Sequence, residues 1–257
     1  MSYTAVELAI VTVVGLAIGS FLNVVIHRLP RKQSVVSPGS RCPNCGAAVR
    51  WHDNIPILSY VALGARCRSC STRISARYPL VELATVAIFI AHYLVLGWTP
   101  LLAVRLVFAA GMVALFAIDL EHQLLPDAIT LPGIVVGLAA SLFLPPGFGD
   151  ALAGLLAGGG FLWLVGEAYY RYAGEEGMGG GDVKMVAMIG AFLGWKLTLL
   201  TLVLSSLLGS IIGLTMVALR RGGLKSALPF GTFLALAGLV ASVWGDRVLA
   251  WYLGPLR

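Results

Sequence analysis

The sequence predicts an all-α polytopic membrane protein with about eight transmembrane helices and a small cytoplasmic insert. Of its 257 residues, 58% are hydrophobic and only 12% are charged, and long apolar segments recur along the chain. Soluble domains carry roughly 25% charged residues, and a folded soluble surface needs much polar cover. A soluble fold of this length cannot bury so much apolar surface, so lipid is the expected environment.

Eight apolar segments approach the length of about 20 residues that a bilayer-spanning helix needs. The first lacks the basic region and the small-residue cleavage site of a removable signal peptide, so we expect it to stay in the mature protein. Pro79, Pro100 and Pro229 stand near helix starts, where a missing N–H costs little. The predicted spans are 5–26, 79–97, 100–118, 128–145, 150–171, 183–196, 198–219 and 229–246.

The basic residues indicate the orientation of these spans. Nine of the 18 Lys and Arg lie in the segment 27–78, whose single acid is Asp53. Short basic loops stay on the cytoplasmic side, which places the N-terminus outside and the loops 119–127, 171–182 and 220–228 inside. Half of the basic charge therefore serves as a topology signal with affinity for anionic lipid headgroups. We expect no nucleic-acid partner.

We expect two parts, an anchoring helix with a cytoplasmic insert over 1–78 and a seven-helix bundle over 79–257. The insert contains the four cysteines, Cys42, Cys45, Cys67 and Cys70, as two C-x2-C pairs separated by 21 residues. Two such pairs can wrap one tetrahedral zinc ion, and four cysteines leave no open position for water, so the predicted role is structural. Two disulfides and unligated thiols are the alternatives, and the reducing cytosol disfavours disulfides.

Two aspartates ask for an explanation, because ionisable groups at membrane depth are costly and mark functional sites. Asp119 ends the third span and Asp182 begins the sixth, both on the predicted inner face. Each also has an alternative interpretation without a catalytic role. Asp182 can be a charge at a helix start favoured by the helix dipole, and Asp119 can be a boundary residue that sets the depth of the third span. Two aspartates that share a site cannot both ionise easily, so a proton is held between them. Such a pair can act as base toward water and as acid toward a leaving amine.

Three glycines before Asp182 strengthen the catalytic interpretation. Consecutive glycines weaken a helix by about 1 kcal/mol each relative to alanine, but they permit close backbone approach and positive φ. We expect Gly179 and Gly181 to leave room for an extended peptide substrate beside the carboxylate. No Ser/His or Cys/His pair competes, since the cysteines are assigned to the metal. Asp127 is expected to cap the fourth span, and Lys184 to snorkel or to pair with an aspartate.

At this point the chain resembles the type IV prepilin leader peptidases, which are bacterial aspartyl proteases of the GxGD type. The resemblance covers nearly the whole chain. The matching motifs, in order, are Gly19-Ser-Phe-Leu-Asn23-Val-Val-Ile-His-Arg28-Leu-Pro30, the double C-x2-C insert with Asn54-Ile-Pro56, Arg77-Tyr-Pro-Leu-Val-Glu82-Leu, Ile-Asp119 with Leu-Pro126-Asp127, and Gly179-Gly-Gly-Asp182-Val-Lys184.

The resemblance implies that Asp119 and Asp182 are the catalytic pair of a bacterial inner-membrane enzyme. It also implies cleavage after a glycine, at the cytoplasmic end of the hydrophobic segment of a prepilin or pseudopilin. Members of the family commonly methylate the new N-terminal residue with S-adenosylmethionine, although no glycine loop of a soluble methyltransferase identifies a binding site for it here. One departure stands at Ala65, where many relatives have glycine, and alanine takes a positive φ less readily.

Three other functions remain to be distinguished. The first is a peptidase without methyltransferase activity. The second is a transporter or channel that uses the two acids as a proton relay. The third is a binding module whose zinc insert recruits a cytoplasmic partner. The transporter gives no role to the glycine run or the cysteine insert, and the binding module predicts that both aspartates tolerate replacement.

Overall fold

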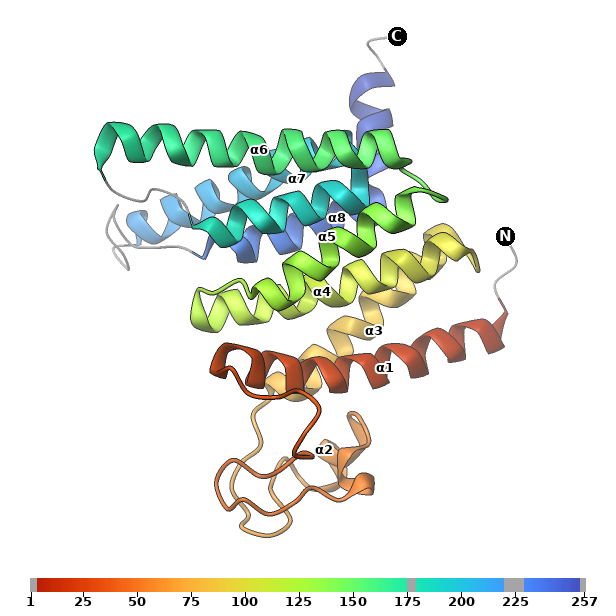
Figure 1. Ribbon diagram of the computed structural model, residues 1–257. Coiled ribbons are helices and arrows are strands. Elements are labelled where there is room, and N and C mark those ends of the chain that lie inside the picture. The colour runs from red at the N-terminus through yellow and green to blue at the C-terminus, as the bar shows by residue number, and fades with distance from the viewer. Residues whose placement is uncertain (1–3, 175–178, 220–228, 255–257) are drawn as a thin grey trace. The chain divides into compact units, whose positions relative to one another are not determined.

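The computed structural model describes residues 4–174, 179–219 and 229–254, and most of them are helical (Figure 1). This part of the chain has no strand, only two isolated β-bridges. Six of its helices are long and apolar enough to cross a membrane, and one further apolar helix is shorter. The predicted fold class, an all-α polytopic membrane protein, is confirmed. The basic loop predicted at 220–228 lies outside the described residues. The other residues left out form only short stretches.

The chain divides into two compact units, Met1–Trp98 and Thr99–Arg257. The division therefore falls after Trp98 and not after residue 78, where the sequence placed it. The reason is the pairing of α1 (Ala5–Arg28) with α3 (Arg77–Leu96), which draws the first helix of the expected seven-helix bundle into the N-terminal unit.

Glycines let α1 and α3 approach closely. A Cβ on Gly19 would stand 2.8 Å from the Cα of Glu82, so the two backbones touch at this level. At the other end of the pair, Tyr93 donates a hydrogen bond of 2.7 Å to Glu7, which also takes part in the capping box that begins α1. The insert between them contains only short elements: η1 (Leu29–Arg31), η2 (Trp51–Asn54) and α2 (Leu58–Ala62).

In the C-terminal unit, the described residues form five helices. They are α4 (Pro100–His122), α5 (Asp127–Ser141), α6 (Phe148–Ala173), α7 (Gly180–Ala218) and α8 (Phe230–Leu253). The buried side chains of α4 and of the first half of α7 form much of its core. At 15 residues, α5 is shorter than the predicted span 128–145 and extends about 23 Å, less than the roughly 30 Å of a bilayer core.

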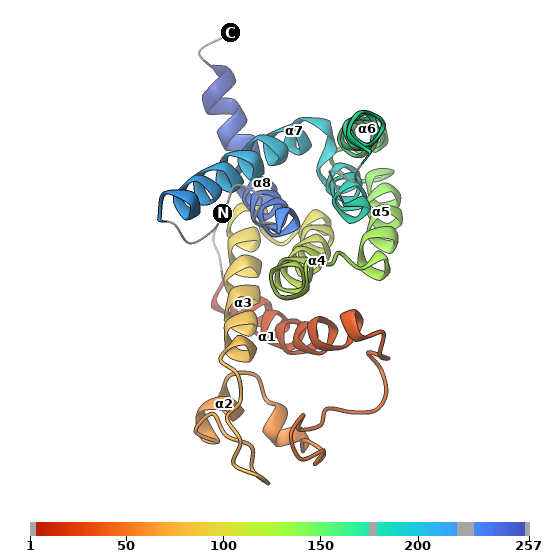
Figure 2. The same ribbon diagram turned by 90° about the vertical axis from the view of Figure 1, so that its left-hand side faces the viewer.

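Helix α7 contains two of the predicted spans. Gly194 interrupts it with φ 77° and ψ 170°, a backbone conformation that favours glycine, and Figure 2 shows the two arms running in different directions. A Cβ at Gly194 would also stand 2.9 Å from the Cβ of Pro146. The break predicted near residue 197 is therefore present, and it occurs where glycine both turns the chain and makes room for the α5–α6 connection.

The first arm of α7 packs directly on α6. A Cβ on Gly154 would stand 2.8 Å from the carbonyl oxygen of Gly190, and one on Gly158 would stand 2.8 Å from Val186. Small residues that allow such backbone contact are the usual means of helix packing in lipid. This contact fixes the arm that begins next to Asp182.

Candidate active site and cysteine cluster

Asp119 lies at the end of α4 and is 5% exposed. Its Oδ2 accepts two hydrogen bonds from Thr232, one from the backbone N–H at 2.6 Å and one from the hydroxyl at 3.0 Å. Thr232 is in the first turn of α8, so Asp119 caps the start of α8 across the bundle. This cap satisfies one of the N–H groups that a helix start leaves unpaired. It also fixes the rotamer of Asp119, and among the residues that the structure describes it engages only one of the two carboxylate oxygens.

Asp182 lies in the first turn of α7, directly after the helix start at Gly179–Gly181. It is half-buried, and the preceding Gly181 packs against Leu125, the residue that also lies against Gly231 beside Asp119. Figure 1 shows why: the end of α4 and the starts of α5, α7 and α8 gather at one end of the C-terminal unit. The structure thus brings the two predicted aspartates into one neighbourhood.

Leu125 holds these helix ends together. It follows α4, is 9% exposed, and lies between two glycines: a Cβ on Gly181 would stand 2.9 Å from its Cβ, and one on Gly231 would stand 2.9 Å from its Cδ1. The same Cβ on Gly231 would stand 3.0 Å from Oδ2 of Asp119. Small residues on α7 and α8 are therefore needed if both helix starts are to reach the carboxylates.

The glycines before Asp182 serve close approach, and none of them has a positive φ. Gly181 faces Leu125, as described above. A Cβ on Gly179 would stand 3.4 Å from Oδ2 of Asp182, whereas Gly180 faces open space. A side chain at Gly179 would thus press on the carboxylate itself.

Asp127 and Lys184 form an ion pair of 2.8 Å beside this site. Asp127 is the first residue of α5 and Pro126 is the N-cap, so the predicted cap lies one residue earlier than expected. Both side chains are substantially exposed, and such pairs contribute little stability. The pair nevertheless gives the lysine a partner other than Asp119 or Asp182.

Sequence reasoning missed Gly231 and Thr232. It used Pro229 only as a helix start, although the sequence Pro229-Phe-Gly-Thr232 places a small residue and a hydroxyl donor in the first turn after the proline. Because the eighth span begins on the same predicted face as Asp119 and Asp182, a glycine–threonine pair there was an available signal.

The four cysteines of the insert form one cluster. Their Sγ atoms all lie within 4.8 Å of one another, no disulfide joins them, and Cys42 Sγ lies 3.8 Å from Cys70 Sγ. A zinc ion about 2.3 Å from each sulfur of a tetrahedron separates the sulfurs by about 3.8 Å. The donor set and its spacing therefore fit a closed tetrahedral metal site, and the cluster could bind zinc.

The two C-x2-C pairs have the same backbone design. In each, the first cysteine donates its N–H across the turn, Cys42 to Ala47 and Cys67 to Thr72, both at 2.9 Å. Asn44 Nδ2 donates to Cys70 Sγ at 3.7 Å. The Thr72 hydroxyl and N–H, together with Asn44, lower the pKa of the Cys70 thiol to about 6, whereas the neighbouring Cys70 raises the pKa of the Cys45 thiol to about 11.

Arg68 ties the second pair to η2. It forms a fork with Asp53, with Nη2 2.6 Å from Oδ1 and Nε 2.9 Å from Oδ2. Arg68 holds the pKa of Asp53 below its usual range. Since the folded pKa is depressed, the contribution of this pair to stability is present above the unfolded pKa and is lost as the pH falls through the folded value.

Ala65 adopts the left-handed conformation that glycine favours. Its φ is 57°, and that of Gly64 is 59°. An L-residue in this region costs roughly 1–2 kcal/mol, so the insert tolerates alanine here at a small cost in stability.

We expect Ala65→Gly to stabilise the insert by about 1 kcal/mol, because it relieves this strain. The measurement is the concentration of guanidinium chloride at which the backbone amides of the insert lose their protection, followed by hydrogen-exchange mass spectrometry. Ala62→Gly in α2 is the matched control and should destabilise by about 1 kcal/mol. An equal loss of stability in both variants would contradict the assignment of strain to Ala65.

Comparison with known proteins finds a family model for each of the two units. The model of the bacterial peptidase A24 N-terminal domain matches residues 13–96, and that of the type IV leader peptidase family matches residues 106–214. The chain is 42% identical to the prepilin leader peptidase/N-methyltransferase of Pseudomonas aeruginosa, over 93% of this chain and 91% of the relative. This chain belongs to the type IV leader peptidase family. Proteins of the same name from Aeromonas salmonicida and Aeromonas hydrophila are 40% and 41% identical, each over more than nine-tenths of both chains. No solved structure shows a significant match.

The two family segments separate the two candidate centres. The leader peptidase segment contains Asp119 and Asp182, the N-terminal segment contains all four cysteines, and Thr232 lies beyond both. With its apolar helices, this member of the leader peptidase family is an integral inner-membrane protein.

Proposed function

We propose that the chain cuts the leader peptide from type IV prepilins or pseudopilins at the cytoplasmic face of the membrane and then methylates the new N-terminal amine. The names of its relatives include both activities. The observation that carries the cleavage reaction is the convergence of Asp119 and Asp182 at the joined ends of α4, α7 and α8.

Asp119 and Asp182 act as the catalytic pair in this proposal. Two carboxyl groups that share one proton can activate water as a base and protonate the leaving amine as an acid. Thr232 commits Oδ2 of Asp119, which leaves Oδ1 to address the attacking water. This chemistry needs no metal ion. The N–H and the hydroxyl of Thr232 keep the buried carboxyl group of Asp119 hydrogen-bonded.

Gly179 and Gly181 give the substrate access in the same proposal. The leader is the polar end of a hydrophobic helix, so its scissile bond reaches the membrane surface as an extended segment. Because Gly179 has no side chain beside Oδ2 of Asp182, a substrate backbone can approach the carboxylate there. Gly181 acts indirectly, by admitting Leu125.

Thr232→Val should slow leader cleavage about 10- to 100-fold. The change removes the hydroxyl donor to Asp119 but keeps the backbone donor, and a hydrogen bond to a charged group contributes about 1.5–3 kcal/mol. The measurement is the single-turnover cleavage rate of a prepilin peptide in detergent. Thr232→Ser keeps the hydroxyl and should retain the rate, and equal losses in both variants would contradict a role for that donor.

The cysteine cluster acts as a structural zinc site in this proposal. Four thiolates complete a tetrahedral shell, and an insert with only short helices needs such a link to fold. The predicted topology puts the insert and both aspartates on the cytoplasmic side, with the N-terminus outside. S-adenosylmethionine is the proposed methyl donor, and when bound it supplies a methyl group activated by a sulfonium.

The purified chain with a prepilin and S-adenosylmethionine tests the whole proposal by product mass. Loss of the leader together with a gain of one methylene mass supports both activities. Loss of the leader alone indicates a peptidase without methyltransferase activity. An unchanged substrate contradicts the proposal, and ion flux in proteoliposomes would then favour the proton relay.

A further inference from the structure

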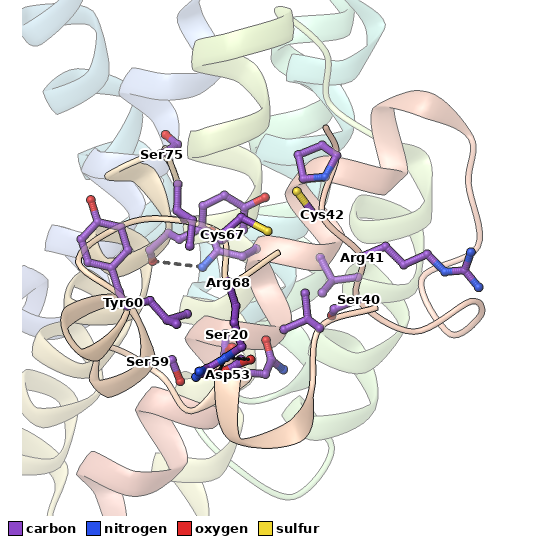
Figure 3. A pocket seen from close by; sticks show the side chains of 18 of the residues that line it. Ser20, Ser40, Arg41, Cys42, Asp53, Ser59, Tyr60, Cys67, Arg68 and Ser75 are labelled. Atoms are coloured by element: carbon purple, nitrogen blue, oxygen red, sulfur yellow. Dashed lines mark hydrogen bonds and ion pairs between the residues drawn. The ribbon is translucent and has the colours of Figure 1, made fainter. Parts of the chain in front are cut away.

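The N-terminal unit contains a cavity of about 690 Å³ between α1, α3 and the insert. Figure 3 shows its lining: Ser20 comes from α1, while Tyr60 and Arg68 come from the insert, and Arg41 extends away from the other labelled side chains. This volume lies in the range of roughly 300–1,000 Å³ that is typical of small-molecule sites. Leader cleavage gives this cavity no role.

Two buried acceptors line the side of the cavity formed by α1 and α3. Asn23 is 3% exposed and Glu82 is 6% exposed. The Asn23 amide donates to the carbonyls of Tyr78 at 3.0 Å and Gly19 at 3.3 Å, which fixes its orientation. Its Oδ1 is buried and has no hydrogen-bond partner within the described residues. A buried acceptor without a donor calls for an explanation.

Glu82 also holds a strained turn against the cavity. Its Oε2 accepts the N–H of Ile57 at 2.8 Å, and Ile57 has φ 60° and ψ −51°. A β-branched residue is an outlier in this region, and such strain gathers at ligand sites. The motifs around Asn23, Pro56 and Glu82, which the aspartate pair does not use, thus meet at one place.

The opposite charge lines the same cavity. Arg50 and Arg73 are exposed lining residues. A ligand that fits both parts presents hydrogen-bond donors or a cation to Asn23 and Glu82 and a carboxylate to an arginine. An anionic lipid headgroup such as that of phosphatidylglycerol would suit the arginines, but it offers no cation to the buried Glu82 carboxylate on the other side.

We propose that this cavity binds S-adenosylmethionine, with the Glu82 carboxylate and Asn23 Oδ1 accepting from its cationic amino-acid end and the arginines facing its carboxylate. The inference rests on the proposed methylation and adds a site to it. The ammonium group supplies three donors and no acceptor, which suits a cavity that both Asn23 and Glu82 line. The adenosine part accounts for a cavity larger than an amino acid requires.

Equilibrium dialysis of tritium-labelled S-adenosylmethionine against the full chain in nanodiscs tests this site without turnover. Glu82→Gln keeps an acceptor for the Ile57 N–H but loses the charge. It should weaken the binding of S-adenosylmethionine at least about tenfold. Glu7→Gln, which changes the other acid on the α1–α3 pair, is the control and should bind as the wild type does. Leader cleavage by each preparation reports on folding, since Glu82 has no part in that reaction.

Ultraviolet cross-linking of the labelled S-adenosylmethionine to the wild-type chain gives a second readout, which does not depend on whether a variant folds. Label in peptides of the segments 19–28 and 49–82 supports the proposal, and label within Thr99–Arg257 overturns it. Wild-type affinity in Glu82→Gln overturns it, as does displacement of the donor by phosphatidylglycerol but not by S-adenosylhomocysteine. If the product is methylated but the label lies elsewhere, only the proposed binding site is refuted. If the chain cleaves the leader but neither methylates the product nor binds S-adenosylmethionine, the proposed methylation is refuted as well.

Discussion

Asp119→Asn and Asp182→Asn each reduce leader cleavage by at least about a thousandfold, because each removes a carboxyl from a pair that must hold one proton and one water. The double variant should be hardly worse than either single one, since residues that act as a unit are strongly non-additive. The measurement is product mass against time with a purified prepilin in detergent, at matched protein concentration.

Asp127→Asn is the matched control for the aspartates. Asp127 lies on the same stretch of chain and is an exposed acid paired with Lys184, so its replacement should leave the cleavage rate within about threefold, given how little exposed pairs contribute. Methylation of a precleaved peptide should survive both catalytic substitutions. Unimpaired cleavage by Asp182→Asn, in protein expressed at normal levels, would remove that residue from the mechanism.

Cys67→Ser should abolish N-methylation and metal binding while leader cleavage continues. Structural zinc contributes about 10–16 kcal/mol to the folding of small metal-bound domains, and the insert has only short helices to replace it. The aspartates belong to the other compact unit, so their reaction does not need the metal. The measurements are zinc per chain by elemental analysis and the masses of the products.

Ser69→Ala serves as the control for the cysteine substitution. Ser69 lies between Cys67 and Cys70 and offers no thiolate, so this variant should keep its zinc. Full methylation by Cys67→Ser, or a wild-type chain that contains no zinc, would contradict the structural metal site.

The sequence determined the fold class because lipid imposes length and composition on every spanning helix. The apolar segments identified the helices, including the two arms of α7 as two separate spans with a break near residue 197, whereas the structure places that break at Gly194. The five motifs were enough to indicate the family, which the comparisons confirmed. Short-range chemistry also predicted that two C-x2-C pairs would come together, and the four sulfurs do cluster.

Only the tertiary structure decided which helices pack together and which groups support the candidate sites. The pairing of α1 with α3 depends on Gly15 and Gly19 fitting against Val86 and Glu82, a complementarity of two surfaces that no periodicity reveals. The same holds for Thr232, which reaches Asp119 from 113 residues away, and for Leu125 between Gly181 and Gly231. Hydropathy reports how each segment interacts with lipid, whereas such contacts depend on the shapes of two segments at once, and those shapes meet only in the folded chain.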